Sequence, residues 1–156
     1  MPRPTSTRRT CTSTGPAPRA RRNDWSRPRR PSVREYVAGV GARPGVPADE
    51  VLALVSRAIP PDGRLVVLAT LDSRAAEPGL ITAARSLRVP LLAYSAAELS
   101  SVPVPSPSAR VHAATGTAGV AEAAAVRGAG VGAVLVVPKT VGDGRRVTCA
   151  VAARRP

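Results

Sequence analysis

Short apolar runs and amphipathic segments follow one another along the chain from residue 33 onward. The apolar runs are rich in Val, Leu and Ala, and they predict strands that begin at Tyr36 and cover 64–71, 89–94, 133–137 and 147–153. Between several of these runs, apolar residues recur at helical spacing, which predicts helices over 47–59, 78–88 and 120–127. Minor elements are expected as one or two helical turns from Ser95, an extended proline-rich connector over 102–107 and a helical turn over 110–114.

The order of these elements predicts the fold class. Strands that alternate with helices are typical of an α/β fold, and the continuous apolar run 64–71 suits a strand covered on both faces. No crossover helix fits between 133–137 and 147–153, so these two strands should form an antiparallel hairpin. We therefore expect a three-layer α/β/α sandwich with a mostly parallel sheet of about five strands and a C-terminal antiparallel hairpin.

A glycine-rich stretch follows the start of the first strand. Gly39, Gly41 and Gly45 could accept positive φ angles and let a ligand approach, and Arg43 adds a positive charge. The next helix should begin at Pro47, so the stretch is a candidate anion site at a helix N-terminus. A tight turn without a ligand fits it equally well. A dinucleotide fingerprint would need a third glycine at position 44, which is Pro44.

Charge and composition divide the 156 residues into two parts. Residues 1–34 hold ten arginines and a single acid, so most of the net charge of +13 lies there. Residues 1–32 are dominated by Pro, Arg, Ser and Thr, and we expect a disordered basic tail before an α/β domain over 33–156. A basic arm could bind nucleic acid through phosphates, but a solvated tail is the interpretation that we favour.

Other residue types exclude several classes of site. Cys11 and Cys149 lie at opposite ends of the chain, which gives neither a disulfide framework nor a zinc motif. His112 is the single histidine, so a histidine-based metal site is excluded, and we expect neither a metal nor a cofactor. No apolar run is long enough to cross a membrane, and no secretory signal is recognisable. The expected location is the cytoplasm.

Five blocks in the same order resemble the CobE / CbiG C-terminal family of cobalamin biosynthesis over roughly residues 33–155. They are GVGARPG at 39–45, LATLDSRAAEPGL at 68–80, YSAAEL at 94–99 with VPVPSPS at 102–108, GTAGVAEAA at 116–124, and Lys139 with VTCAVA at 147–152. The family often has cysteine where this chain has Ala42 and lysine where it has Arg74. The resemblance implies a compact α/β/α domain that acts on the corrin pathway.

The resemblance also implies a ligand and leaves catalysis open. Full-length CbiG opens the ring lactone of a cobalt-precorrin, but its N-terminal domain has no counterpart here, so a relation to the cobalt-precorrin-5A hydrolase does not by itself make this chain an enzyme. The implied partners are a precorrin or cobalt-precorrin intermediate and other corrin-pathway enzymes. The alternatives are a nucleic-acid binder that uses the basic arm, and a small nucleotide-binding domain that uses the glycine stretch. The oligomeric state is left open.

A corrin precursor is a flat apolar ring with acetate and propionate carboxylates at its periphery, so its site should offer cations and backbone N–H groups. Arg43, Arg74 and Lys139 each follow a predicted strand, although each alone could be a solvated surface cation. The candidate corrin-binding residues are Gly39, Gly41, Arg43, Arg74, Gly116, Thr117 and Lys139.

Two carboxylates are candidates for acid or base catalysis. Glu77 precedes the helix that begins at Pro78, and Glu122 lies three residues after Gly119 at another helix start. Capping of the helix N-terminus is the more common role for both. We expect the loops after the first two strands and the 115–117 turn to line one cleft, with Lys139 near its rim.

Overall fold

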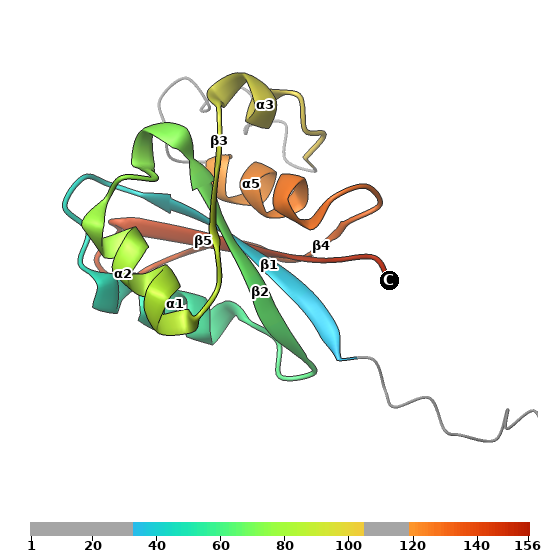
Figure 1. Cartoon of the computed structure of the whole chain (residues 1–156), viewed down its shortest axis with the longest axis horizontal. Helices are drawn as coiled ribbons and strands as arrows, with labels where there is room; N and C mark the ends of the chain where they lie inside the picture. Colours follow the sequence, from blue (N-terminus) through green and yellow to red (C-terminus); the bar gives the residue numbers. More distant parts are fainter. Residues whose placement is uncertain (1–32, 105–118) are drawn as a thin grey trace, which may run out of the picture. The chain divides into compact units, whose positions relative to one another are not determined.

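The computed structural model describes residues 33–104 and 119–156. The expectations for the tail 1–32, for the helical turn 110–114 and for the turn that contains Gly116 and Thr117 lie outside the described residues. Within them the elements follow the expected order (Figure 1). They are β1 (Arg34–Ala42), α1 (Ala48–Ala58), β2 (Gly63–Leu71), the short 3₁₀ helix η1 (Asp72–Arg74), α2 (Pro78–Leu87), β3 (Leu91–Tyr94), α3 (Ala96–Ser100), α5 (Val120–Ala129), β4 (Val134–Val141) and β5 (Val147–Ala153).

The five strands form one mixed sheet in the order β3-β2-β1-β5-β4. β1 pairs with β2, and β2 with β3, in parallel, whereas β5 is antiparallel to both of its neighbours, β1 and β4. The antiparallel C-terminal hairpin is confirmed, but the sheet is parallel on one side only. The reason lies in β5, whose residues are buried on both faces. It therefore takes a central place beside β1, and β4 becomes an edge strand.

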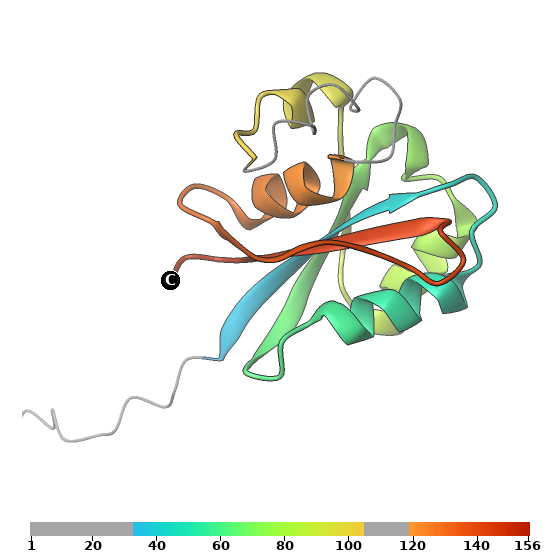
Figure 2. The same ribbon diagram turned by 180° about the vertical axis from the view of Figure 1, so that it is seen from behind.

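Two apolar clusters lie on opposite faces of the sheet. On β1, Tyr36, Ala38 and Val40 belong to the cluster that includes residues of α1 and α2, and Val37 belongs to the cluster that includes residues of α3 and α5. Figures 1 and 2 show the two pairs of helices on the two sides of the sheet. With no phenylalanine in the chain, both clusters consist mainly of Ala, Val and Leu. These small side chains allow helix and sheet to approach closely.

Three boundaries differ from those expected from the sequence. β1 continues through Gly39 and Gly41 to Ala42, so neither glycine belongs to the loop. α5 continues past Gly128 to Ala129, and Gly130, with φ of 91°, is the residue that follows its end. β4 runs to Val141, where a turn was expected from position 138, because an edge strand tolerates Pro138.

The glycine at position 128 allows close packing, and it does not end the helix as expected. A Cβ atom at this position would lie 2.8 Å from Cγ1 of Val37 and 3.3 Å from Cβ of Ala69. The glycine thus lets α5 approach the sheet. In the described residues, no helix is long and apolar enough to span a membrane.

Candidate ligand-binding site

The parallel strands β1, β2 and β3 end at the same edge of the sheet, which we call the carboxyl edge. The loop 43–47, the segment 72–77 and Ser95 follow these strands, so the topology gathers them there. β4 runs in the same direction as β1, because both are antiparallel to β5. Its last residues therefore point to this edge as well. Figure 2 shows the β1–α1 loop beside the β4–β5 turn.

Glu77 joins two of these loops. Its Oε2 accepts a hydrogen bond of 3.1 Å from the N–H of Gly45, and its Oε1 lies 3.7 Å from NH1 of Arg74. Glu77 precedes the first residue of α2, but its side chain makes no capping hydrogen bond there. Its carbonyl oxygen accepts from Leu80 and Ile81 instead. The expectation that this carboxylate caps α2 is therefore wrong. The amide that donates to it belongs to Gly45 and not to the first turn of α2.

The backbone amides of the glycine loop are already bonded within the protein. The N–H of Arg43 donates to the carbonyl of Arg146 at 2.8 Å, and that of Val46 donates to the carbonyl of Arg43 at 3.3 Å. Gly45 donates to Glu77, and Pro47, the residue before α1, has no N–H. The amides of Arg43, Gly45 and Val46 therefore already have acceptors within the protein. An anion site at the start of α1, where no side chain caps the helix, stays a prediction.

The two glycines of β1 pack closely against neighbouring elements, and their contact with a ligand stays a prediction. Their φ angles are not positive, unlike that of Gly45, whose φ is 73°. A Cβ atom on Gly39 would overlap the backbone of α5 at Ala121 and Ala125, so α5 fills the space on this side of the glycine. A Cβ atom on Gly41 would lie 2.7 Å from Oγ1 of Thr148, whose hydroxyl donates to the Gly41 carbonyl.

Two cations lie in the loops of the carboxyl edge where the sequence predicts them. Arg43 is exposed and forms no ion pair with the residues that the structure describes. Arg74 is about one-third exposed at its side chain (34%), and among the described residues its ion pair is the long contact to Glu77. A guanidinium can bind a carboxylate through two parallel hydrogen bonds. Arg43 and Arg74 together therefore form a candidate site for a ligand with more than one carboxylate.

Lys139 and Glu122 form a second linked pair. Lys139 lies inside β4, two residues before its end, and not after the strand as expected. Its backbone N–H donates to Oε1 of Glu122 at 3.1 Å, and Glu122 is 5% exposed. Among the described residues, Glu122 thus accepts a hydrogen bond from strand β4. The sequence had suggested instead that it accepts one from an amide at the start of its own helix, α5. The reason is a β-bulge, in which Pro138 and Lys139 lie opposite the single residue Ala150.

Residues at the end of β3 were not recognised as site candidates from the sequence. The guanidinium of Arg127 lies 6.0 Å from the ring centre of Tyr94 and 3.8 Å from Oε1 of Glu98. The capping box of Ser95 and Glu98 is confirmed, and the backbone and hydroxyl hydrogen bonds of Ser95 lower the pKa of Glu98. The available signal was a tyrosine at the last position of a predicted strand and an arginine in the last turn of a helix.

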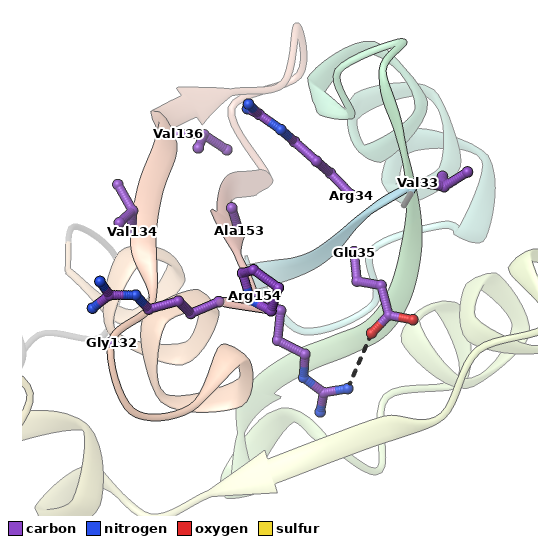
Figure 3. A pocket seen from close by; sticks show the side chains of 10 residues that line it. Val33, Arg34, Glu35, Gly132, Val134, Val136, Ala153 and Arg154 are labelled. Atoms are coloured by element: carbon purple, nitrogen blue, oxygen red, sulfur yellow. Dashed lines mark ion pairs between the residues drawn. The ribbon is translucent and has the colours of Figure 1, made fainter. Parts of the chain in front are cut away.

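A cavity of about 790 Å³ lies at the opposite edge of the sheet, where β1 and β4 begin and β5 ends. Its lining combines valines with charged residues: Val33, Arg34, Glu35, Gly132, Val134, Val136, Ala153, Arg154, Arg155 and Pro156. Figure 3 shows the ion pair of Arg154 with Glu35, at 3.5 Å, within it. Arg64 and Arg154 lower the pKa of Glu35. Nothing in the sequence pattern pointed to this cavity.

The described residues provide neither a reactive thiol nor a cluster of metal ligands. Cys149 lies in the core, and burial raises the pKa of its thiol to about 12, so it is not a nucleophile at neutral pH. Among the described residues, no group of three His, Cys, Asp or Glu side chains is placed to bind a metal ion.

Comparison with known proteins gives consistent matches. A family model described as cobalamin synthesis G C-terminus matches residues 36–152. Protein CobE from Sinorhizobium sp. is 46% identical over an alignment 113 residues long, which covers 67% of this chain and 72% of that protein. The crystal structure of a CobE protein from the cobalamin (vitamin B12) biosynthetic pathway has a TM-score of 0.61 and 32% identity, and the match covers 77% of this chain and 90% of that one. For cobalamin biosynthesis protein chiG from Agrobacterium tumefaciens str. C58 the TM-score is 0.58 and the identity 31%, over 78% and 99% of the two chains.

Proposed function

Because this chain belongs to the family of the cobalamin synthesis G C-terminus, we propose that it binds a precorrin or cobalt-precorrin intermediate at the carboxyl edge of its sheet. It is a cobalamin biosynthesis protein of the CobE and CbiG type. The ligand, the binding residues and the step that it serves are the parts that we propose.

The observation that carries the proposal is the exposure of Arg43 together with its lack of an ion-pair partner among the described residues. This side chain is exposed at the carboxyl edge, and the described residues offer it no carboxylate partner. The loop that bears it is joined through Glu77 to the segment that bears Arg74. Two guanidinium groups on linked loops suit the peripheral acetates and propionates of a corrin precursor.

Lys139 and the start of α5 extend the proposed site. The side chain of Lys139 is partly exposed near the end of β4, where it can approach a further carboxylate. Gly116 and Thr117 precede α5, and we propose that free N–H groups at this helix start help to hold the ligand. Both residues lie outside the described part of the chain, so their role stays a prediction.

We propose binding, and not acid–base chemistry, as the role of this domain. The carboxylates of Glu77 and Glu122 both accept hydrogen bonds from backbone amides, which is a structural use of each group. Neither is therefore proposed as the catalytic acid or base. If the domain assists ring-lactone opening, it does so by holding the intermediate for a partner enzyme of the pathway.

The two alternative functions gain no support. A nucleotide site in the glycine loop would need free backbone amides, and those of Arg43, Gly45 and Val46 are bonded within the protein. The nucleic-acid alternative depends on residues 1–32, which lie outside the described residues.

The direct experiment is a visible-absorbance titration of the purified full chain with cobyrinic acid, a cobalt corrin with free acetate and propionate side chains. We expect a saturable change in the corrin absorbance at low ionic strength, weakened by salt, because exposed ion pairs are screened. Absence of any change with folded protein would overturn the proposed function.

A further inference from the structure

Glu77 is buried more deeply than most charged residues at the carboxyl edge, and both of its oxygens are occupied. Its side chain is 17% exposed, with Oε2 on the Gly45 amide and Oε1 facing Arg74. We propose that Glu77 is a positioning residue that holds the Arg43 loop at a fixed place relative to Arg74. This inference rests on the proposed function, because it assigns Glu77 a role in the same binding site.

Backbone packing brings the two loops into direct contact beside Glu77. A Cβ atom on Gly79 would overlap the carbonyl oxygen of Val46, so the first turn of α2 lies directly against the loop. Gly45 has a φ of 73°, a conformation that few other residues adopt without strain. The loop therefore has a specific conformation, and the Glu77 carboxylate bonds to the residue with that unusual φ.

Within the described part of the chain, three hydrogen bonds from backbone amides hold the segment from Arg43 to Val46, and they differ in kind. The Arg43 amide donates to Arg146, the Val46 amide donates to Arg43, and the Gly45 amide donates to Glu77. The first two join backbone groups, so no side-chain substitution removes them directly. The third depends on a side chain from 32 residues away in the sequence. The hydrogen bond from the Gly45 amide to Glu77 is therefore the one of the three that a substitution can remove selectively.

The same carboxylate also affects the charge at the site. The 3.7 Å contact between Oε1 and Arg74 partly neutralises a cation that the proposed ligand would use. A glutamine at position 77 would still accept from the Gly45 amide but would carry no charge. Glu77→Gln therefore separates the positioning role from the charge, and Glu77→Ala removes both.

The first experiment observes the loop without any ligand. In ¹H–¹⁵N NMR spectra and amide hydrogen exchange of the full chain, E77A should shift the Gly45 amide resonance and speed its exchange, whereas E77Q should keep both near wild type. Glu35→Gln is the matched control, because Glu35 also pairs with arginines but lies at the opposite edge. If E77A does not fold, E77D, which is one methylene shorter, replaces it. An unchanged Gly45 amide in the folded variant would overturn the proposal.

The second experiment tests the coupling of Glu77 to Arg43 by a double-mutant cycle with cobyrinic acid. E77A should weaken binding about tenfold in the wild-type background and by less than about twofold in the R43A background, because the two changes disrupt one contact. E77Q should bind at least as tightly as wild type. Independent, additive losses, or a loss of binding in E77Q equal to that in E77A, would overturn the positioning role.

The two proposals fail in different ways. If wild type does not bind cobyrinic acid, the proposed function fails, and the NMR experiment still decides whether Glu77 holds the loop. If wild type binds and R43A weakens binding while E77A has no effect, the proposed function stands and the role of Glu77 is disproved.

Discussion

The carboxylate of Glu122, on α5, accepts a hydrogen bond of 3.1 Å from the backbone N–H of Lys139, on β4. The contact lies where the β4–β5 ladder has two residues opposite one, so the bulge leaves an amide available. Glu122 provides the acceptor that the ladder does not. The acid thus links the first turns of α5 to the edge strand that carries Lys139.

Removing this acceptor should reduce stability. We expect E122A to lose about 1–3 kcal/mol in the free energy of unfolding, because the Lys139 amide loses its partner. E122Q keeps an oxygen at the same place and should lose clearly less. Urea denaturation of the two variants measures the difference, and equal losses would show that the hydrogen bond is not what matters at this position.

Gly39 and Gly41 are two residues apart on β1, and they should respond differently to alanine. G39A places a methyl group against the backbone of α5 and should cost about 1–3 kcal/mol or more. G41A meets the hydroxyl of Thr148, which can rotate away, so it should cost less. Thermal unfolding of both variants compares them. A G39A variant as stable as G41A would contradict the close packing of α5 on β1.

The buried thiol of Cys149 predicts a loss of stability at alkaline pH. Its pKa is about 12 in the folded protein and 9.0 for a free thiol, so above pH 9 the unfolded chain loses the proton first. Stability should therefore fall by roughly 1.4 kcal/mol near pH 10 relative to near pH 8, and C149A should lack this part of the decrease. Urea midpoints at both pH values for wild type and C149A test it, and parallel decreases would disprove it.

Much of the fold, but little of the site's chemistry, could be predicted from the sequence. Apolar periodicity located β2, α1, α2 and β5 to within one or two residues, because burial on a strand or helix leaves a local pattern. The end of β4 was missed because Pro138 and the glycines after it are typical of a turn, and an edge-strand bulge has no distinct local signature.

The roles of the glycines and acids depend on distant partners. Gly39, Gly128 and Gly45 are alike in the sequence, but the first two lie in the contact between α5 and the sheet and the third has a positive φ. The bond of Glu77 to Gly45 joins residues 32 positions apart, and no local rule predicts it. The loop positions of Arg43 and Arg74, in contrast, follow from strand order alone.

Arg43 should contribute to affinity and not to stability. Arg43→Ala removes one charge-assisted pair, which is worth roughly 1.5–3 kcal/mol when it is shielded by ligand, so cobyrinic acid should bind about tenfold more weakly or worse. The matched control is Arg57→Ala, since Arg57 lies on α1 and pairs with Asp143 at 3.4 Å on the surface. Isothermal titration of both variants measures the effect. Similar affinities of R43A and R57A would exclude Arg43 from the site.

The central claim is that the carboxyl edge recognises the peripheral carboxylates of a corrin. Parallel absorbance titrations of the wild-type chain with cobyrinic acid and with its fully methyl-esterified form test it most directly, because the ring and the cobalt are the same in both. We predict saturable binding of the acid and at least tenfold weaker binding of the ester, with the difference largely lost in the double variant R43A/R74A. Equal affinity for acid and ester would contradict the account.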